Sequence, residues 1–376
     1  MTVVLADTLR LAVVVILLSI GALAQSALEQ AVTLAREKRY AEARRMLDGV
    51  AEPGDVKQRV AFHRLRAAIA SGLGEAAGAA DEMESAMKLA PDDQALLLAT
   101  VVAELQAGRL DPALQHANGA GNTAAGQALL GDIQEKRGRF VEAANAYREA
   151  VKLAPDREQY RIALALELVE HQTFPPAIAV LEQAAPLFPT SAKIRTLLGI
   201  ARYAYGEVDG AENSLADAIR ADPKMEPAYA YLAQIALESS AAPPQRVIDA
   251  LCGWNRTVCS AMELRVARDK GDAALLSKAI QGLKSAPADD PVSSCELGRA
   301  YEWTSQWTEA RACMETCVRV KPAPQNHYRL GLIYSQLGLT DLAHQEMELR
   351  KRALQDMSDE DARRRNAVQA FEYAVR

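Results

Sequence analysis

Residues 130–155 read LGDIQEKRGRFVEAANAYREAVKLAP, and the spacing of small and large residues in this stretch recurs along the chain. Gly131 is followed after twelve residues by Ala143, and then by Tyr147, Ala150 and Pro155. The same offsets recur in sets that begin at Ala67, Ala165, Gly199 and Gly298. The sets at residues 131, 165 and 199 follow one another at a step of 34 residues, and such a fixed period indicates a repeat architecture.

Each block predicts a pair of antiparallel helices. Ala143, Tyr147 and Ala150 are spaced i, i+4 and i+7, so they share one face of the second helix. The small residue at Gly131 lets that second helix approach the first one closely. Pro155 ends the second helix because it has no backbone N–H and restricts the residue before it. Glycines mark the turn between the two helices, at Gly108, Gly138, Gly206 and Gly338.

These blocks resemble the tetratricopeptide repeat, a helix–turn–helix unit of about 34 residues. The match is clearest in Leu130-Gly131…Pro155, and further copies start at Leu297-Gly298 and Leu330-Gly331. Ten units of this kind fit between residues 26 and 356. The resemblance implies an all-α fold, a right-handed superhelical solenoid of about ten hairpins in which first helices line a concave groove.

Composition supports the helical prediction and limits the partners. Apolar residues make up 49% of the chain and aromatic residues only 5%, which suits close-packed helices better than sheets. The net charge of −6 is wrong for a phosphate-binding surface, so we expect no nucleic acid partner. We expect a signal peptide at 1–24, repeats at 25–123, 124–253 and 291–356, a degenerate repeat at 254–290, and a capping helix at 357–376.

The N-terminal segment has the pattern of a secretory signal. An apolar run over residues 11–24 follows Arg10, and Ala22 and Ala24 predict cleavage before Gln25. The run is shorter than the roughly 20 residues of a membrane-spanning helix. Asp7 reduces the positive charge ahead of the run, which leaves an uncleaved anchor open. We therefore expect an exported protein, periplasmic or secreted; the alternative is a chain anchored to the membrane by residues 1–24 and facing away from the cytoplasm.

A partner-binding groove is predicted on the first helices by offset from the small residue of each unit. The predicted groove residues are Ile162, Leu166, Thr196, Ile200, Tyr203, Gln234, Arg299, Trp303 and Tyr328, and the earlier copy adds Asp132, Glu135 and Lys136. Repeats that clamp a chaperone carboxylate carry Lys and Asn on this stripe, so a clamp of that kind is disfavoured here. Aromatic anchors with Arg299 as an orienting charge favour an extended or helical peptide. Packing between neighbouring repeats is the alternative for each residue.

All five cysteines lie between residues 252 and 317, which invites disulfides in an exported protein. Cys252 and Cys259 flank one short loop and are expected to pair. Cys295 faces either Cys313 or Cys317, and the spacing leaves this choice open. The cysteines lack the histidines or second close pair of a zinc set, so we predict no metal ligand.

No catalytic motif is recognisable, since the sequence lacks a glycine-rich phosphate loop, a nucleophile elbow and a His-Glu-x-x-His pair. We predict neither a catalytic residue nor a cofactor. The function expected is a non-catalytic scaffold that binds a protein or peptide partner, in the cell envelope. The alternative is a regulatory or substrate-holding subunit of an enzyme, secretion or assembly complex whose catalytic chain is separate. The sequence does not indicate the oligomeric state.

Overall fold

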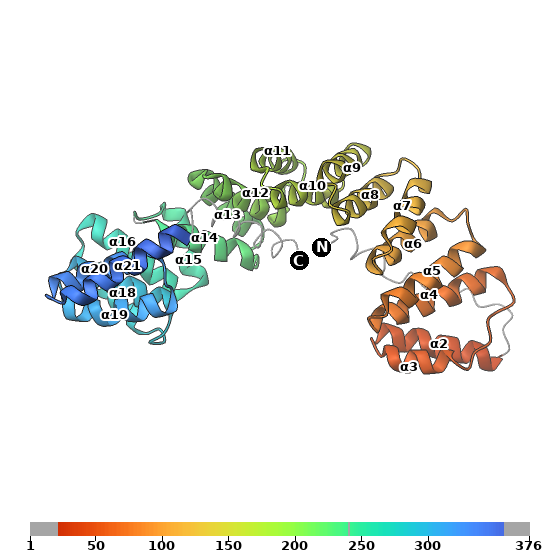
Figure 1. The fold of residues 1–376 in the computed structure, drawn as a ribbon, viewed down its shortest axis with the longest axis horizontal. Helices are drawn as coiled ribbons and strands as arrows, with labels where there is room; N and C mark the ends of the chain where they lie inside the picture. Colours follow the sequence, from red (N-terminus) through yellow and green to blue (C-terminus); the bar gives the residue numbers. More distant parts are fainter. Residues whose placement is uncertain (1–21, 240, 357–376) are drawn as a thin grey trace. The chain divides into compact units, whose positions relative to one another are not determined.

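The computed structural model describes residues 22–239 and 241–356, and this part of the chain contains twenty helices and no strand. In Figure 1 the colours follow the sequence, from α2 in red to α21 in blue. The all-helical repeat architecture expected from the sequence is confirmed, and twenty helices are consistent with ten hairpins. The chain divides into two compact units, and the boundary in the sequence lies between His171 and Gln172.

The N-terminal unit comprises α2 to α10. Its helices are α2 (Ala22–Arg36), α3 (Tyr40–Leu47), α4 (Val56–Gly72), α5 (Ala76–Leu89), α6 (Gln94–Gln106), α7 (Leu110–Gly119), α8 (Ala124–Lys136), α9 (Phe140–Leu153) and α10 (Glu158–Glu170). Side-chain oxygens cap several of these helices, as where Asp93 accepts from the backbone N–H groups of Ala95 and Leu96 at the start of α6. Such caps satisfy donors that have no partner inside the helix.

The C-terminal unit comprises α11 to α21. Its helices are α11 (Phe174–Ala184), α12 (Ala192–Tyr205), α13 (Val208–Ala221), α14 (Glu226–Glu238), α15 (Gln245–Trp254), α16 (Arg256–Lys270), α17 (Ala273–Lys284), α18 (Pro291–Trp303), α19 (Trp307–Val320), α20 (Pro324–Gln336) and α21 (Thr340–Asp356). Residues 256–287, the weakest copy by sequence, still form the helix pair α16 and α17.

The small residue of each block allows the close helix contact that the sequence predicted. A Cβ atom added at Gly131 of α8 would lie 2.5 Å from the ring of Tyr147 on α9. At Gly199 of α12, the added atom would lie 2.6 Å from Leu215 on α13. The turn glycine Gly138 has φ 71°, a left-handed conformation that side-chain-bearing residues rarely adopt. The repeated glycines are therefore explained by two different constraints on the backbone.

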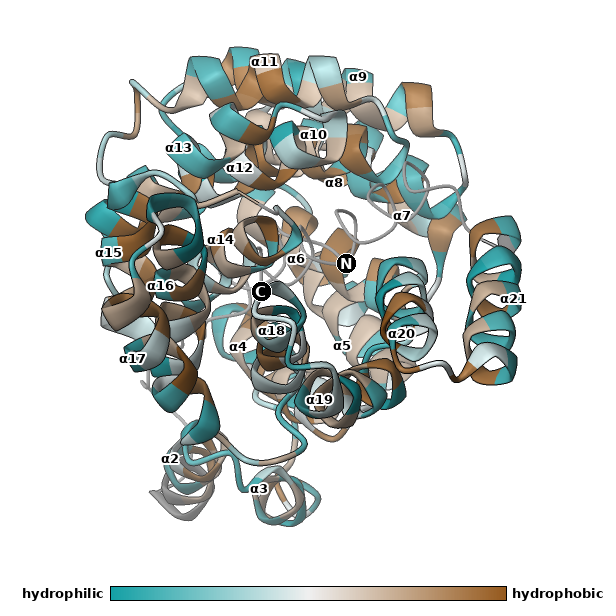
Figure 2. Cartoon of the chain, turned by 90° about the vertical axis from the view of Figure 1, so that its left-hand side faces the viewer, coloured by the Kyte–Doolittle hydropathy of each residue, from teal (hydrophilic) through white to brown (hydrophobic). Residues whose placement is uncertain are grey.

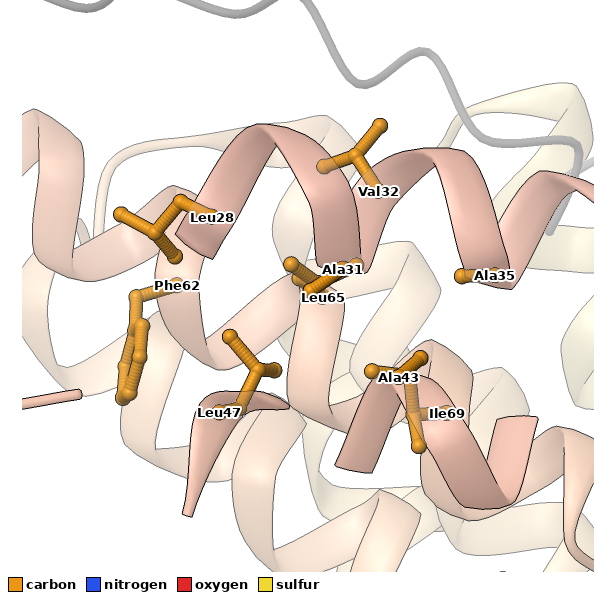
Figure 3. Packing of buried hydrophobic residues seen from close by; sticks show 9 residues of the cluster. All are labelled: Leu28, Ala31, Val32, Ala35, Ala43, Leu47, Phe62, Leu65 and Ile69. Carbon is orange, nitrogen blue, oxygen red and sulfur yellow. The ribbon is translucent and has the colours of Figure 1, made fainter. Parts of the chain in front are cut away.

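Each hairpin buries apolar residues against its neighbours. In the cluster of Figure 3, Leu28 of α2, Leu47 of α3 and Phe62 of α4 meet from three successive helices. The helices carry hydrophilic residues as well, as α15 and α16 show in Figure 2. Contacts run mainly between helices adjacent in sequence, which is the pattern expected of stacked repeats.

Two sequence predictions fall largely outside the described residues. The predicted capping helix at 357–376 and residues 1–21 of the predicted signal peptide lie there. In the part of the chain that is described, no helix has both the length and the hydropathy needed to cross a membrane. The six predicted sequence segments stay predictions.

Candidate functional site

Five of the nine predicted groove residues are buried. They are Ile162 and Leu166 on α10, and Thr196, Ile200 and Tyr203 on α12. Both helices bury most of their residues, on all sides of the helix, so a stripe chosen by offset is not exposed there. Their burial is what the packing alternative expects, and partner binding by the groove stripe stays a prediction.

The other four predicted groove residues keep some exposed surface in the C-terminal unit. Tyr328 on α20 is 41% exposed, and Gln234, Arg299 and Trp303 are partly exposed. The guanidinium of Arg268 lies 4.7 Å from the ring centre of Trp303, within the range of a cation–π contact. We call Arg268, Arg299, Trp303, Tyr328 and Arg329 the aromatic–arginine surface.

Arg299 also belongs to a buried ion network. Glu296 Oε1 on α18 accepts hydrogen bonds from Arg265 Nη2 of α16 at 3.0 Å and from Arg299 Nη1 at 2.9 Å. Arg265 is 1% exposed and also donates to the backbone carbonyls of Leu237, Ser239 and Ala261. Burial lowers the pKa of Arg299, and the Arg329 and Arg265 charges act in the same direction. This network joins α16 to α18 with a carboxylate between two arginines.

A second charged site, the acidic pocket, lies in the N-terminal unit. It is a small pocket that is partly open to solvent. Its lining comes from α8, α9 and α10 and consists of Asp132, Glu135, Tyr147, Ala163, Leu166, Glu167 and Glu170. Four of these seven side chains are carboxylates, and no residue of the lining is basic.

Burial of the carboxylates dominates the electrostatics of the acidic pocket. Tyr147 Oη donates to Asp132 Oδ1 at 2.7 Å, whereas Asp132 Oδ2 is buried without a hydrogen-bond partner. Burial raises the pKa of Asp132 to about 7, although the Tyr147 hydrogen bond opposes the shift. Burial also raises the pKa of Glu167 to about 8, with further contributions from the charges of Glu135, Glu170 and Asp132.

His171 follows α10 directly and lies beside the acidic pocket. Its ring packs against that of Phe140, with the ring centres 3.6 Å apart. Its Nε2 lies 3.5 Å from Glu167 Oε1, and burial lowers the pKa of the imidazole. One donor atom each from Glu167, Glu170 and His171 lies within 4.8 Å of the others. These three residues are therefore close enough to contact one small ligand together.

Sequence reasoning missed this convergence. Glu167, Glu170 and His171 are spaced i, i+3 and i+4, a signal that they share one end of one helix face. Asp132 and Glu135 come from the preceding repeat, where they were assigned to the groove stripe. The packing of the two successive repeats brings both groups to the same pocket between α8 and α10.

The cysteines form two pairs in the C-terminal unit. Cys252 at the end of α15 is bonded to Cys259 on α16, and Cys295 on α18 is bonded to Cys317 on α19. Of the two partners that the sequence left open for Cys295, the structure has Cys317. Cys313 is a partly buried thiol, and burial raises its pKa.

Comparison with known proteins identifies part of the repeat array. Family models described as tetratricopeptide repeat match residues 124–157 and 168–235. No curated protein matches the chain. A tetratricopeptide-repeat protein from Thermus thermophilus is similar at 19% identity and a TM-score of 0.35, over 57% of this chain and 99% of that one.

Two further solved structures are similar at comparable levels. For the C-terminal part of a repeat protein from Cytophaga hutchinsonii, the identity is 16% and the TM-score 0.40, over 78% of this chain and 95% of that one. YrrB, described as a protein with an unusual peptide-binding site, is similar at 15% identity and a TM-score of 0.35. The match covers 52% of this chain and 93% of that one. By the family models, the chain contains tetratricopeptide repeats over residues 124–157 and 168–235, and such repeats indicate a protein–protein interaction scaffold.

Proposed function

We propose that the chain is a non-catalytic scaffold that binds a segment of a protein partner on the aromatic–arginine surface of its C-terminal unit. The observation that carries this proposal is the exposed ring of Tyr328, whose centre lies 4.7 Å from the Arg350 guanidinium. The same unit contains the partly exposed Trp303, which Arg268 contacts in the same way. Aromatic and arginine side chains are the residues that most often dominate binding energy at protein interfaces.

The charges of this surface favour a partner segment that carries carboxylates. Arg268 pairs with Asp269 at 2.6 Å while 30% of its side chain stays exposed. Arg329 pairs with Glu302 at 2.6 Å while keeping part of its side chain exposed. A carboxylate bound here would meet planar donors that suit it, and an apolar residue of the same segment would pack on the exposed aromatic rings.

Site-specific photo-crosslinking tests this function. A photoreactive phenylalanine analogue replaces Trp303 or Tyr328 in the full chain, and Tyr205 serves as the matched control because it is 53% exposed elsewhere in the same unit. We expect the same crosslinked partner from positions 303 and 328 and none from position 205. Crosslinks that are absent, or equal at all three positions, would contradict the proposal.

The compartment is part of the same proposal. Two disulfides and the apolar run before Gln25 support an oxidising location outside the cytoplasm, such as the cell envelope. Sequencing the N-terminus of the protein isolated from cells tests this, because cleavage leaves Gln25 first. A chain that starts at Met1 and sediments with membranes would instead support the anchored form, and a chain that starts at Met1 in the cytosol would contradict export.

A further inference from the structure

The acidic pocket and His171 bring together donor groups that a cation would bind. The pocket is not simply a patch of surface acids, since Asp132 is 2% exposed and Glu167 is 3% exposed. Each has one buried carboxylate oxygen without a hydrogen-bond partner, Asp132 Oδ2 and Glu167 Oε1. A buried acceptor without a donor costs free energy, so a ligand that supplies positive charge there would be stabilised.

The separation of the donor atoms matches that of ligands on one metal ion. Glu167 Oε1 and His171 Nε2 lie 3.5 Å apart. Neighbouring ligand atoms of a tetrahedral zinc site lie about 3.4 Å apart, because Zn–N and Zn–O bonds are each about 2.1 Å long. Glu170 places a third donor atom within 4.8 Å of both, which a change of side-chain rotamer can shorten.

The backbone around the pocket also favours a cation. Glu135 lies in the last turn of α8, and Glu170 is the last residue of α10. The carbonyl ends of two helices therefore point toward the same region, and the C-terminal end of a helix carries partial negative charge. The contact of His171 with the Phe140 ring fixes the imidazole beside the carboxylates.

We propose that Glu167, Glu170 and His171 bind a divalent transition-metal ion, with Asp132 and Glu135 completing the negative environment of the site. The mixed imidazole and carboxylate set suits zinc or manganese better than magnesium, which requires oxygen ligands in near-octahedral geometry. The position of the site between α8 and α10 makes the ion a link between two successive repeats. The metal is expected to stabilise the packing of α8 against α10 and to take no part in a reaction.

Calorimetric titration of the full, untagged, metal-free chain with Zn²⁺ tests the site. We expect one ion per chain, with weaker binding of Mn²⁺ and the weakest of Mg²⁺. His171→Gln should weaken Zn²⁺ binding at least about tenfold, since even outer-sphere changes cost 10–100-fold. Glu170→Gln should weaken Zn²⁺ binding to a similar extent. Because Glu170 is partly exposed, this variant should fold even if His171→Gln folds poorly.

Two matched controls separate this site from other zinc ligands. His116 also contacts a buried carboxylate, with Nδ1 3.0 Å from both oxygens of Glu104, so His116→Gln tests an ordinary histidine–glutamate pair in the same unit. Cys313→Ser removes the free thiol. Both variants should bind Zn²⁺ as the wild type does. No binding by the wild type, or equal loss in His116→Gln or Cys313→Ser, would overturn the proposal.

Hydrogen exchange gives an independent readout. Bound Zn²⁺ should slow amide exchange in α8 and α10, because both helices supply the site, and should leave exchange in α6 and α7 unchanged. The slowing should be absent in His171→Gln. Equal protection of α6 and α7, or none in α8 and α10, would contradict a site at this position.

Discussion

Glu167 on α10 and Glu296 on α18 are both buried carboxylates on the first helix of a hairpin, but the charges around them differ. Each is 3% exposed, and each keeps one oxygen without a hydrogen-bond partner. Glu296 lies between the guanidinium groups of Arg265 and Arg299, at 3.0 and 2.9 Å. Glu167 lies in a pocket whose other charged lining residues are carboxylates, and its closest described partner is an imidazole at 3.5 Å.

The difference separates a structural charge from a charge available to a ligand. The Glu296 carboxylate is matched within the protein, so removing it leaves arginines buried without compensation. Burial and the neighbouring carboxylates raise the pKa of Glu167 to about 8, so folding near pH 7 must protonate this group, and a neutral side chain at this position avoids that cost. Burial alone therefore does not distinguish a structural carboxylate from one that is available to a ligand. The distinction comes from whether the carboxylate oxygens are paired with cationic groups of the protein.

The largest expected effect is the loss of stability on replacing Glu296. Glu296→Gln keeps the size of the side chain but leaves Arg265 and Arg299 without the charge between them. We expect the C-terminal unit to lose about 3–5 kcal/mol of unfolding free energy. Urea unfolding followed by tryptophan fluorescence measures it, because all three tryptophans, Trp254, Trp303 and Trp307, belong to this unit.

Glu302→Gln is the matched control for that experiment. Its pair with Arg329 is partly exposed, and partly exposed pairs contribute at most about 1 kcal/mol. Equal losses from the two variants would mean that the buried network is no more important than a surface ion pair.

A smaller effect is expected from pH in the N-terminal unit. Asp132 has its folded-state pKa raised to about 7, so its contribution to stability is fully present below its unfolded pKa near 3.8 and is lost as the pH rises through 7. The contribution of Asp132 to the unfolding free energy should fall by at most about 1.4 kcal/mol per pH unit in this window, and Glu167, with its pKa raised to about 8, adds a contribution of the same sign. Circular dichroism of urea unfolding at pH 5 and pH 7, in the presence of a chelator, measures the change.

Asp132→Asn should reduce this pH dependence without abolishing it. The amide does not titrate and its oxygen still accepts from Tyr147, but Glu167, with its pKa raised to about 8, still titrates in the same window. The tryptophan signal of the C-terminal unit serves as an internal control, since it should not respond to the substitution. A pH dependence that is the same in both proteins would assign the effect to other groups.

The smallest expected effect comes from a disulfide that closes a short loop. Replacing Cys252 and Cys259 together by Ser should cost the C-terminal unit about 2 kcal/mol, because the bond constrains only a seven-residue separation. Tryptophan-monitored unfolding under non-reducing conditions gives the value. Cys313→Ser should change little, and a loss as large as in the double variant would contradict the pairing.

The sequence predicted the hairpins because their determinants are local. Gly131, Ala143 and Tyr147 lie within one repeat, and the contact between Gly131 and Tyr147 follows from their spacing. The exposure of the groove stripe was not predictable in this way. Leu166, Ile200 and Arg299 share one offset in their repeats, yet the first two are buried and the third is partly exposed.

The acidic pocket depends on how two repeats pack, which the period alone does not fix. Asp132 and Glu167 are far apart in sequence, and neither acid alone indicates a site. Their convergence requires the rotation of α10 against α8, and that rotation is set by the side chains packed between the two helices. The i, i+3, i+4 spacing of Glu167, Glu170 and His171 was the one local signal.

Urea unfolding of Glu167→Gln and Glu296→Gln, side by side at pH 7 with a chelator, tests the contrast between the two buried acids most directly. Circular dichroism reports both units and tryptophan fluorescence reports the C-terminal one. We expect opposite signs, with Glu167→Gln stabilising the N-terminal unit and Glu296→Gln destabilising the C-terminal unit. Destabilisation by both substitutions would contradict it.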